Sequence, residues 1–130
     1  MGRKNGNTLD LLLSRATKET EVSEMKLTTE TLGEVIVKIP PFRKIAELID
    51  EVSDENIGMY EAMLANAQLV YDSVPALNQN YAELSEAYDE KDPRALTIKI
   101  FEVAQALGEL NDIAEKIQDS YGAYKEAVKN

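Results

Sequence analysis

The sequence predicts a mainly α-helical fold: a helical bundle with a long C-terminal helix and a small N-terminal β-hairpin. Apolar residues recur at helical spacing from residue 42 onward, which indicates amphipathic helices. Upstream of residue 40, two short runs alternate apolar with polar residues, as half-buried strands do. The 130 residues are enough for one domain with a core. We therefore expect a flexible basic segment with a short helix over residues 1–20, and a single helical domain over residues 21–130.

The short helix is predicted within TLDLLLSRA, where Thr8 can cap the first turn. Leu9, Leu12 and Leu13 are spaced to lie on one side of such a helix. With so many leucines in a short segment, this helix would have a strongly apolar surface. We expect it to dock either on the body of the protein or on a partner.

The hairpin is predicted at about residues 22–39. Met25 and Leu27 alternate with polar residues in the first strand, and Gly33 suits a turn or bulge because it can adopt a positive φ. The second strand carries the apolar side chains of Val35, Val37 and Ile39. Two strands alone are marginally stable in water. The hairpin must therefore pack on helices or pair with another chain.

Three helices are predicted after the hairpin. Pro40 and Pro41 end the second strand, and the first helix follows, with its end near Ser53. The second helix is expected to begin at Ser53 or Asp54 and to end before Pro75. The third restarts at Pro75 and runs to the charged loop at residues 89–92.

The C-terminal helix is the strongest helical signal. Asp92 is a good N-cap, and Pro93 fits the first helical position. Without a break at Gly108 or Gly122, the helix would run for roughly 37 residues, or ~55 Å. Its apolar residues follow a heptad pattern. They are Leu96, Ile100, Val103, Leu107, Leu110, Ala114, Ile117, Tyr121, Tyr124 and Val128.

The composition argues against catalysis. The chain contains no Cys and no His, so the commonest zinc ligands and the usual general base are missing. It has no Gly-rich phosphate-binding motif, and its acidic clusters lack the spacing of a calcium-binding EF-hand loop. We expect no enzymatic activity, no cofactor and no metal ion.

The charge is unevenly distributed along the chain. Residues 1–18 carry +3, from four basic residues and one acid, and the net charge of −10 therefore leaves −13 on the remainder. An acidic body repels phosphate groups, so neither nucleic acid nor a membrane surface is an expected partner. No apolar run approaches the ~20 residues that span a bilayer, and LDLLL is too short for a signal peptide. We expect a cytoplasmic protein.

The order of elements resembles that of a known family. LTTETLGEVIVKIPPFRKIAELIDE leads into helices, and DPRALTIKIFEVAQALGELNDIAEKI follows late in the chain. This layout, from about Leu27 to Ile117, resembles the tail assembly chaperones of long-tailed bacteriophages. The resemblance implies a non-catalytic protein that binds the aggregation-prone, helical tape measure protein before the tail tube forms, and that self-associates.

Two functional classes lead at this point, ahead of an acidic nucleic-acid mimic or an antirepressor. One is the chaperone, with an apolar surface that receives an amphipathic helix. The other is a homo-oligomeric coiled-coil protein with a structural or regulatory role, joined along residues 96–128. The residues expected to contact a partner are Leu9, Leu12, Leu13, Val35, Val37, Ile39, Leu107, Leu110, Ile117, Tyr121 and Tyr124.

Overall fold

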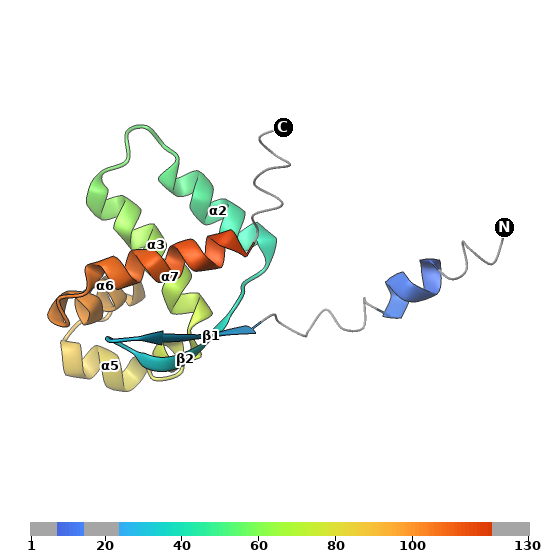
Figure 1. Ribbon diagram of the computed structural model, residues 1–130. Coiled ribbons are helices and arrows are strands. Elements are labelled where there is room, and N and C mark those ends of the chain that lie inside the picture. The colour runs from blue at the N-terminus through green and yellow to red at the C-terminus, as the bar shows by residue number, and fades with distance from the viewer. Residues whose placement is uncertain (1–7, 15–23, 121–130) are drawn as a thin grey trace.

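The computed structural model describes residues 8–14 and 24–120 (Figure 1). A short helix spans residues 8–14. The elements of the body are β1 (Glu24–Thr29), β2 (Gly33–Lys38), α2 (Phe42–Val52), α3 (Met59–Ser73), α4 (Pro75–Asn78), α5 (Tyr81–Tyr88), α6 (Pro93–Val103) and α7 (Leu107–Asp119). The prediction of a helical bundle with a small hairpin is confirmed.

The hairpin pairs β1 with β2 in antiparallel register, from Glu24 opposite Lys38 to Thr29 opposite Gly33. The three loop residues are followed by Gly33 at φ +72°, a left-handed conformation that glycine adopts without steric cost. Val37 is fully buried and Val35 is 7% exposed, so the inner face of the sheet belongs to the core. The sheet therefore packs on the helical body, which is one of the two arrangements predicted for it.

The proline joint has the predicted structural role. Pro41 precedes α2, and its carbonyl accepts hydrogen bonds from the N–H groups of Lys44 and Ile45 at 3.0 and 3.3 Å. The end of α2 also agrees with the prediction. The start of α3 does not, because the Asp54 carboxylate accepts from the N–H of Asn56 at 2.9 Å and closes a local turn instead of capping a helix.

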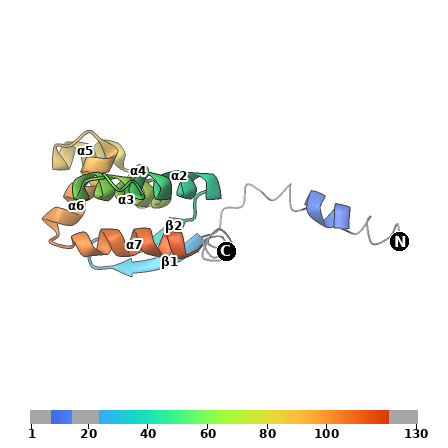
Figure 2. The same cartoon turned by 90° about the horizontal axis from the view of Figure 1, so that it is seen from above.

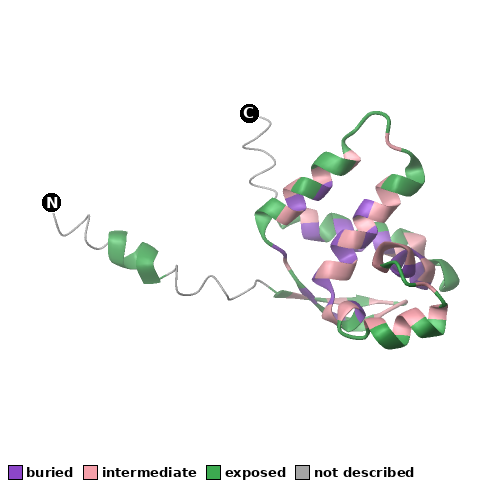
Figure 3. Ribbon diagram, turned by 180° about the vertical axis from the view of Figure 1, so that it is seen from behind, coloured by how far each residue is buried: buried purple, intermediate pink, exposed green. Residues whose placement is uncertain are grey.

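Helix α3 is at the centre of the body. It packs against α2, α4, α6 and α7. Figure 2 shows α7 and the hairpin on one side of α3 and α5 on the other. The purple ribbon in Figure 3 follows the core through these elements. Its largest fully buried side chains are Phe101, Ile45, Leu69, Leu96, Leu110, Ile113 and Ile117.

The long C-terminal helix is divided in two within the described residues. Helix α6 ends at Val103, and Gln105 adopts φ +57°. The N–H of Gln105 bonds to the carbonyl of Glu102 at 2.9 Å, and the N–H of Ala106 bonds to that of Phe101 at 2.8 Å. This is the hydrogen-bond pattern of a Schellman C-cap. The chain then turns, so that α6 and α7 each pack against α3 instead of continuing as one rod.

Replacing Gln105 with glycine should stabilise the protein. A residue with a Cβ in the left-handed conformation lowers the stability of the fold by ~1–2 kcal/mol. Glycine removes this cost, but its greater freedom in the unfolded chain lowers stability by ~0.5–1 kcal/mol. We expect the free energy of unfolding in urea to rise by about 0.5–1 kcal/mol. Gln105→Val, which puts a β-branched residue at the same φ, should lower it. A continuous helix through residue 105 would give the opposite order.

Among the described residues, no helix has both the length and the apolar character needed to cross a bilayer.

Candidate protein-interaction surfaces

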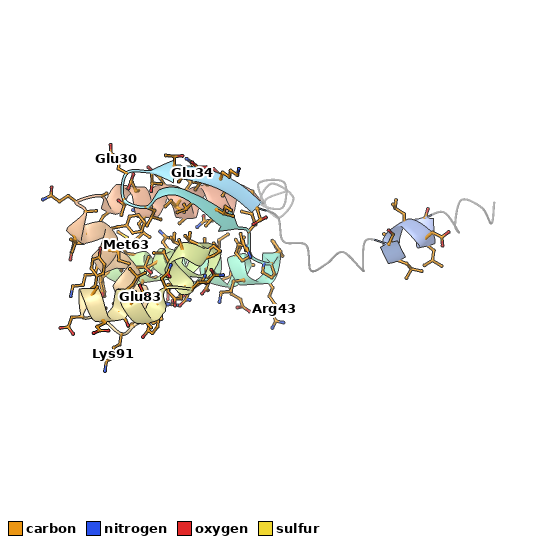
Figure 4. All side chains as sticks on the ribbon, turned by 90° about the horizontal axis from the view of Figure 1, so that it is seen from below. Glu30, Glu34, Arg43, Met63, Glu83 and Lys91 are labelled. Atoms are coloured by element: carbon orange, nitrogen blue, oxygen red, sulfur yellow. The ribbon has the colours of Figure 1, made fainter. Side chains whose placement is uncertain are left out.

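The helix at residues 8–14, called here the leucine helix, is the most exposed apolar element of the described chain. All of its residues are exposed, and Figure 3 shows it in green throughout. Leu9, Leu11, Leu12 and Leu13 are 55, 50, 55 and 56% exposed. Side chains project from several sides of this helix in Figure 4. Helices shorter than ~12 residues are marginal in water, so this one needs a partner surface to be stable.

Four of the predicted contact residues are in the core instead. Val35 and Val37 face the helices, and Leu110 and Ile117 are fully buried. The alternation in the strand and the heptad pattern correctly identified these four positions as buried, whereas Val103, also in the heptad pattern, is 63% exposed. The prediction that these side chains meet a partner is wrong for the folded surface, because this chain itself covers them.

For four other predicted contact residues, the described structure shows neither clear exposure nor full burial. Ile39 and Leu107 are partly buried and pack against the core. Tyr121 and Tyr124 lie outside the described residues.

A second exposed apolar site is at the loop between α2 and α3, which projects from the body (Figure 1). Met59 is 87% exposed and Tyr60 is 60% exposed, at the first turn of α3. Residues 50–61, called here the acidic apex, contain no Lys or Arg and five acids: Asp50, Glu51, Asp54, Glu55 and Glu61. The sequence predicted the N-cap of this helix at Ser53 or Asp54, whereas the observed N-cap is Gly58, so Met59 and Tyr60 lie in the first turn of α3.

Salt bridges in the body hold α2 in place. Lys44 Nζ lies 2.9 Å from Asp72 Oδ2, and Arg94 Nη1 lies 2.9 Å from Glu51 Oε1. Arg94 also donates through Nε to Gln68 Oε1 at 3.0 Å. These bonds join α2 to α3 and α6. The charged side chains of these ion pairs connect helices, and they do not form a group of reactive side chains.

Glu109 fastens the hairpin tip to the start of α7. Its carboxylate accepts from the N–H groups of Glu30 and Thr31 at 2.8 and 3.1 Å, and from the Thr31 hydroxyl. Figure 4 shows Glu30 at this tip. The hydrogen bond from the Thr31 side chain holds the pKa of Glu109 below its ordinary value, the two backbone bonds add to this, and partial burial opposes it. Seventy-eight residues separate Thr31 from Glu109, so sequence reasoning could not pair them.

Glu109→Gln should loosen the tip of the hairpin. The amide keeps one acceptor but points an NH2 group at backbone donors, so we expect a loss of about 1–2 kcal/mol in the free energy of unfolding at pH 7. A lowered folded-state pKa stabilises the fold above about pH 4.5, the ordinary value, and this gain disappears as the pH falls through the lower folded value.

Urea unfolding of wild type and Glu109→Gln across pH 3 to 7 measures this difference. The gap between the two proteins should narrow at acid pH. A gap that is constant over the whole range would show that the charge of Glu109 is not what stabilises the tip.

The described residues also form one polar recess of about 360 Å³, open to solvent, between α3 and α7. Asn66 Nδ2 donates to Asn111 Oδ1 across it at 3.2 Å. Its other lining residues are Ala114, Glu115, Gln118 and Asp119. In the described part of the chain, no group of three or more His, Cys, Asp or Glu residues is arranged to hold a metal ion. The recess is a polar surface groove with no catalytic arrangement among its lining residues.

Comparisons with protein-family models, with curated proteins and with solved structures find no match to this chain. The function is therefore inferred from the surface itself. Exposed leucines are suited to protein association.

Proposed function

We propose that this protein is a non-enzymatic tail assembly chaperone, which binds an aggregation-prone helical client, the tape measure protein, during phage tail morphogenesis and self-associates. Its site of action would be the host cytoplasm. The observation that carries the proposal is the leucine helix, whose four leucines are each at least half exposed. An element of this kind is costly in water unless another protein covers it.

The size of the leucine helix limits the affinity of one contact. Burying the exposed half of a leucine contributes about 1 kcal/mol, so the three leucines on one side of the helix, Leu9, Leu12 and Leu13, contribute at most about 3 kcal/mol before the cost of association is subtracted. One copy would therefore bind weakly. Several copies that associate along one long client would gain effective concentration, which agrees with a chaperone that coats its client and later leaves it.

The body supports this role by its charge. Residues 19–130 carry −13, since residues 1–18 carry +3 of the net −10. A charged exterior keeps an apolar complex soluble. The alternative, a homo-oligomeric coiled-coil protein, has lost part of its support, because the chain itself buries five residues of the predicted seam: Leu96, Ile100, Leu110, Ala114 and Ile117.

Co-expression with a tape measure protein tests the proposal. Leu9→Gln combined with Leu12→Gln removes two neighbours on one stripe of the helix, and should weaken client binding by about 30-fold at ~1 kcal/mol per leucine. Leu11→Gln is the control, because residue 11 lies roughly 160° from residue 9 around the helix. Glutamine retains helix propensity, so loss of the helix would not explain a difference.

The readout is the amount of tape measure protein in the soluble fraction, followed by binding measurements on the purified proteins. Wild type and Leu11→Gln should keep the client soluble, and the double variant should not. If wild type gives no gain in client solubility, the chaperone function is wrong.

A further inference from the structure

We infer that, in the absence of client, the leucine helix of one copy docks on the acidic apex of a second copy. The inference rests on the proposed function only in taking the leucine helix as the binding element. It adds a specific surface for self-association and a regulated state of the same site. A client would have to displace the neighbouring copy before it could bind the leucines.

The first argument is apolar complementarity. The leucine helix presents four half-exposed leucines, and Met59 at the apex is 87% exposed, beside Tyr60 at 60%. Methionine is flexible enough to adapt to leucine side chains, and tyrosine is enriched at interfaces. The apex projects as a loop and helix start from the body (Figure 1), so a helix of another molecule can approach it.

The second argument is charge complementarity. The apex has five acids and no base, and in the described part of the chain only Glu51 of these has an ion-pair partner, Arg94. The leucine helix contains one acid, Asp10, and is flanked in the sequence by basic residues. These are Arg3, Lys4, Arg15 and Lys18. Opposite charges on two apolar surfaces steer them together and favour this pairing over helix-to-helix or apex-to-apex contacts, which would bring like charges together.

The third argument concerns which copy is bound. Every residue of the leucine helix is exposed, so the helix does not cover the apex of its own chain. A contact between two different surfaces of identical molecules is heterologous, and such contacts form open chains or rings instead of closed two-fold dimers. The expected behaviour is therefore a series of oligomers that grows with protein concentration.

Analytical ultracentrifugation of the full-length protein over a concentration series tests the inference. The mean mass should rise with concentration at about 50 mM salt, and rise less at about 500 mM salt, where exposed charges are screened. Asp50→Lys with Glu55→Lys reverses charge at the apex. Glu83→Lys with Glu86→Lys makes the same change in net charge on exposed positions of α5. The apex pair should need roughly tenfold more protein to associate, and the α5 pair should behave as wild type does.

An apolar pair of variants makes the second comparison. Met59→Gln with Tyr60→Gln should weaken association, whereas Val103→Gln, at a site that is 63% exposed on α6, should not. All of these positions are exposed, so circular dichroism and urea unfolding should show an intact fold. Client binding is measured on the same proteins, and the apex variants should retain it.

The outcomes separate the inference from the proposed function. Apex variants that associate as wild type does would overturn the inference alone. Wild type that stays monomeric at every concentration would overturn the inference together with the self-association in the proposed function, and would leave client binding unaffected. Apex variants that lose the client as well would make the apex the client site, which also overturns it. Retained client binding together with lost self-association in the apex variants supports it.

Discussion

Leu110→Ala is expected to lower the free energy of unfolding by about 2–5 kcal/mol. Leu110 is fully buried in α7, and α7 packs against α3 and α6. Removing its branched side chain takes away apolar contacts and leaves a cavity that a packed core fills only in part. Urea unfolding followed by circular dichroism measures the change. Leu107→Ala is the matched control in the same helix, and should cost less because Leu107 is only partly buried.

The same variant distinguishes the observed fold from the coiled coil that the heptad pattern predicted. In a coiled coil, Leu110 would face a second chain, and its loss would lower the oligomer mass together with stability. In the observed fold, the loss of stability does not depend on protein concentration. A concentration-dependent midpoint for wild type that Leu110→Ala abolishes would contradict the intramolecular packing of α7.

Local sequence patterns were sufficient to predict several of the observed elements. The alternation around Val35 and Val37 predicted the second strand, and the proline pair predicted the joint to α2. Asp92 caps α6 as expected, since its carboxylate accepts from the N–H of Arg94 at 3.0 Å. In each case, the residues that decide the structure are close neighbours in the sequence.

The break between α6 and α7 could not be predicted from local patterns. The Schellman cap has Gln105 at its left-handed position, where glycine is the usual signal. Gly108, the position considered for a break, lies inside α7. Tertiary packing decides the break, because two shorter helices can both bury their apolar faces against α3. The clamp from Glu109 to the hairpin tip is likewise a long-range contact with no local signature.

The sequence predicted only some of the candidate surfaces correctly, because burial also depends on long-range packing. The leucine helix stands out in the sequence by its leucine density, and the structure places a helix there. Whether a heptad or strand position faces the core or a partner depends on what the rest of the chain covers. That is why Leu110 and Ile117 were assigned to an interface while Met59 was not considered.

Val37→Glu is expected to destabilise the protein by at least about 3 kcal/mol at pH 7. Val37 is fully buried on the inner face of the hairpin, and a carboxylate there would lose its water without gaining a partner. Burial would raise the pKa of the new carboxyl group, so the loss should be smaller at low pH, where the group is protonated in both folded and unfolded states. Chemical unfolding at pH 7 and pH 3 measures both parts.

Ile36→Glu is the matched control, one residue away in β2. Ile36 is 47% exposed on the outer face and lies opposite Lys26, so a glutamate there gains a cross-strand charge pair. Its free energy of unfolding should stay within ~0.5 kcal/mol of wild type. The same variant tests whether the outer face of the hairpin joins subunits. A lower oligomer mass with unchanged stability would place the hairpin in the interface, and an unchanged mass would leave self-association to the leucine helix and the acidic apex. Equal losses of stability for both variants would contradict the strand register.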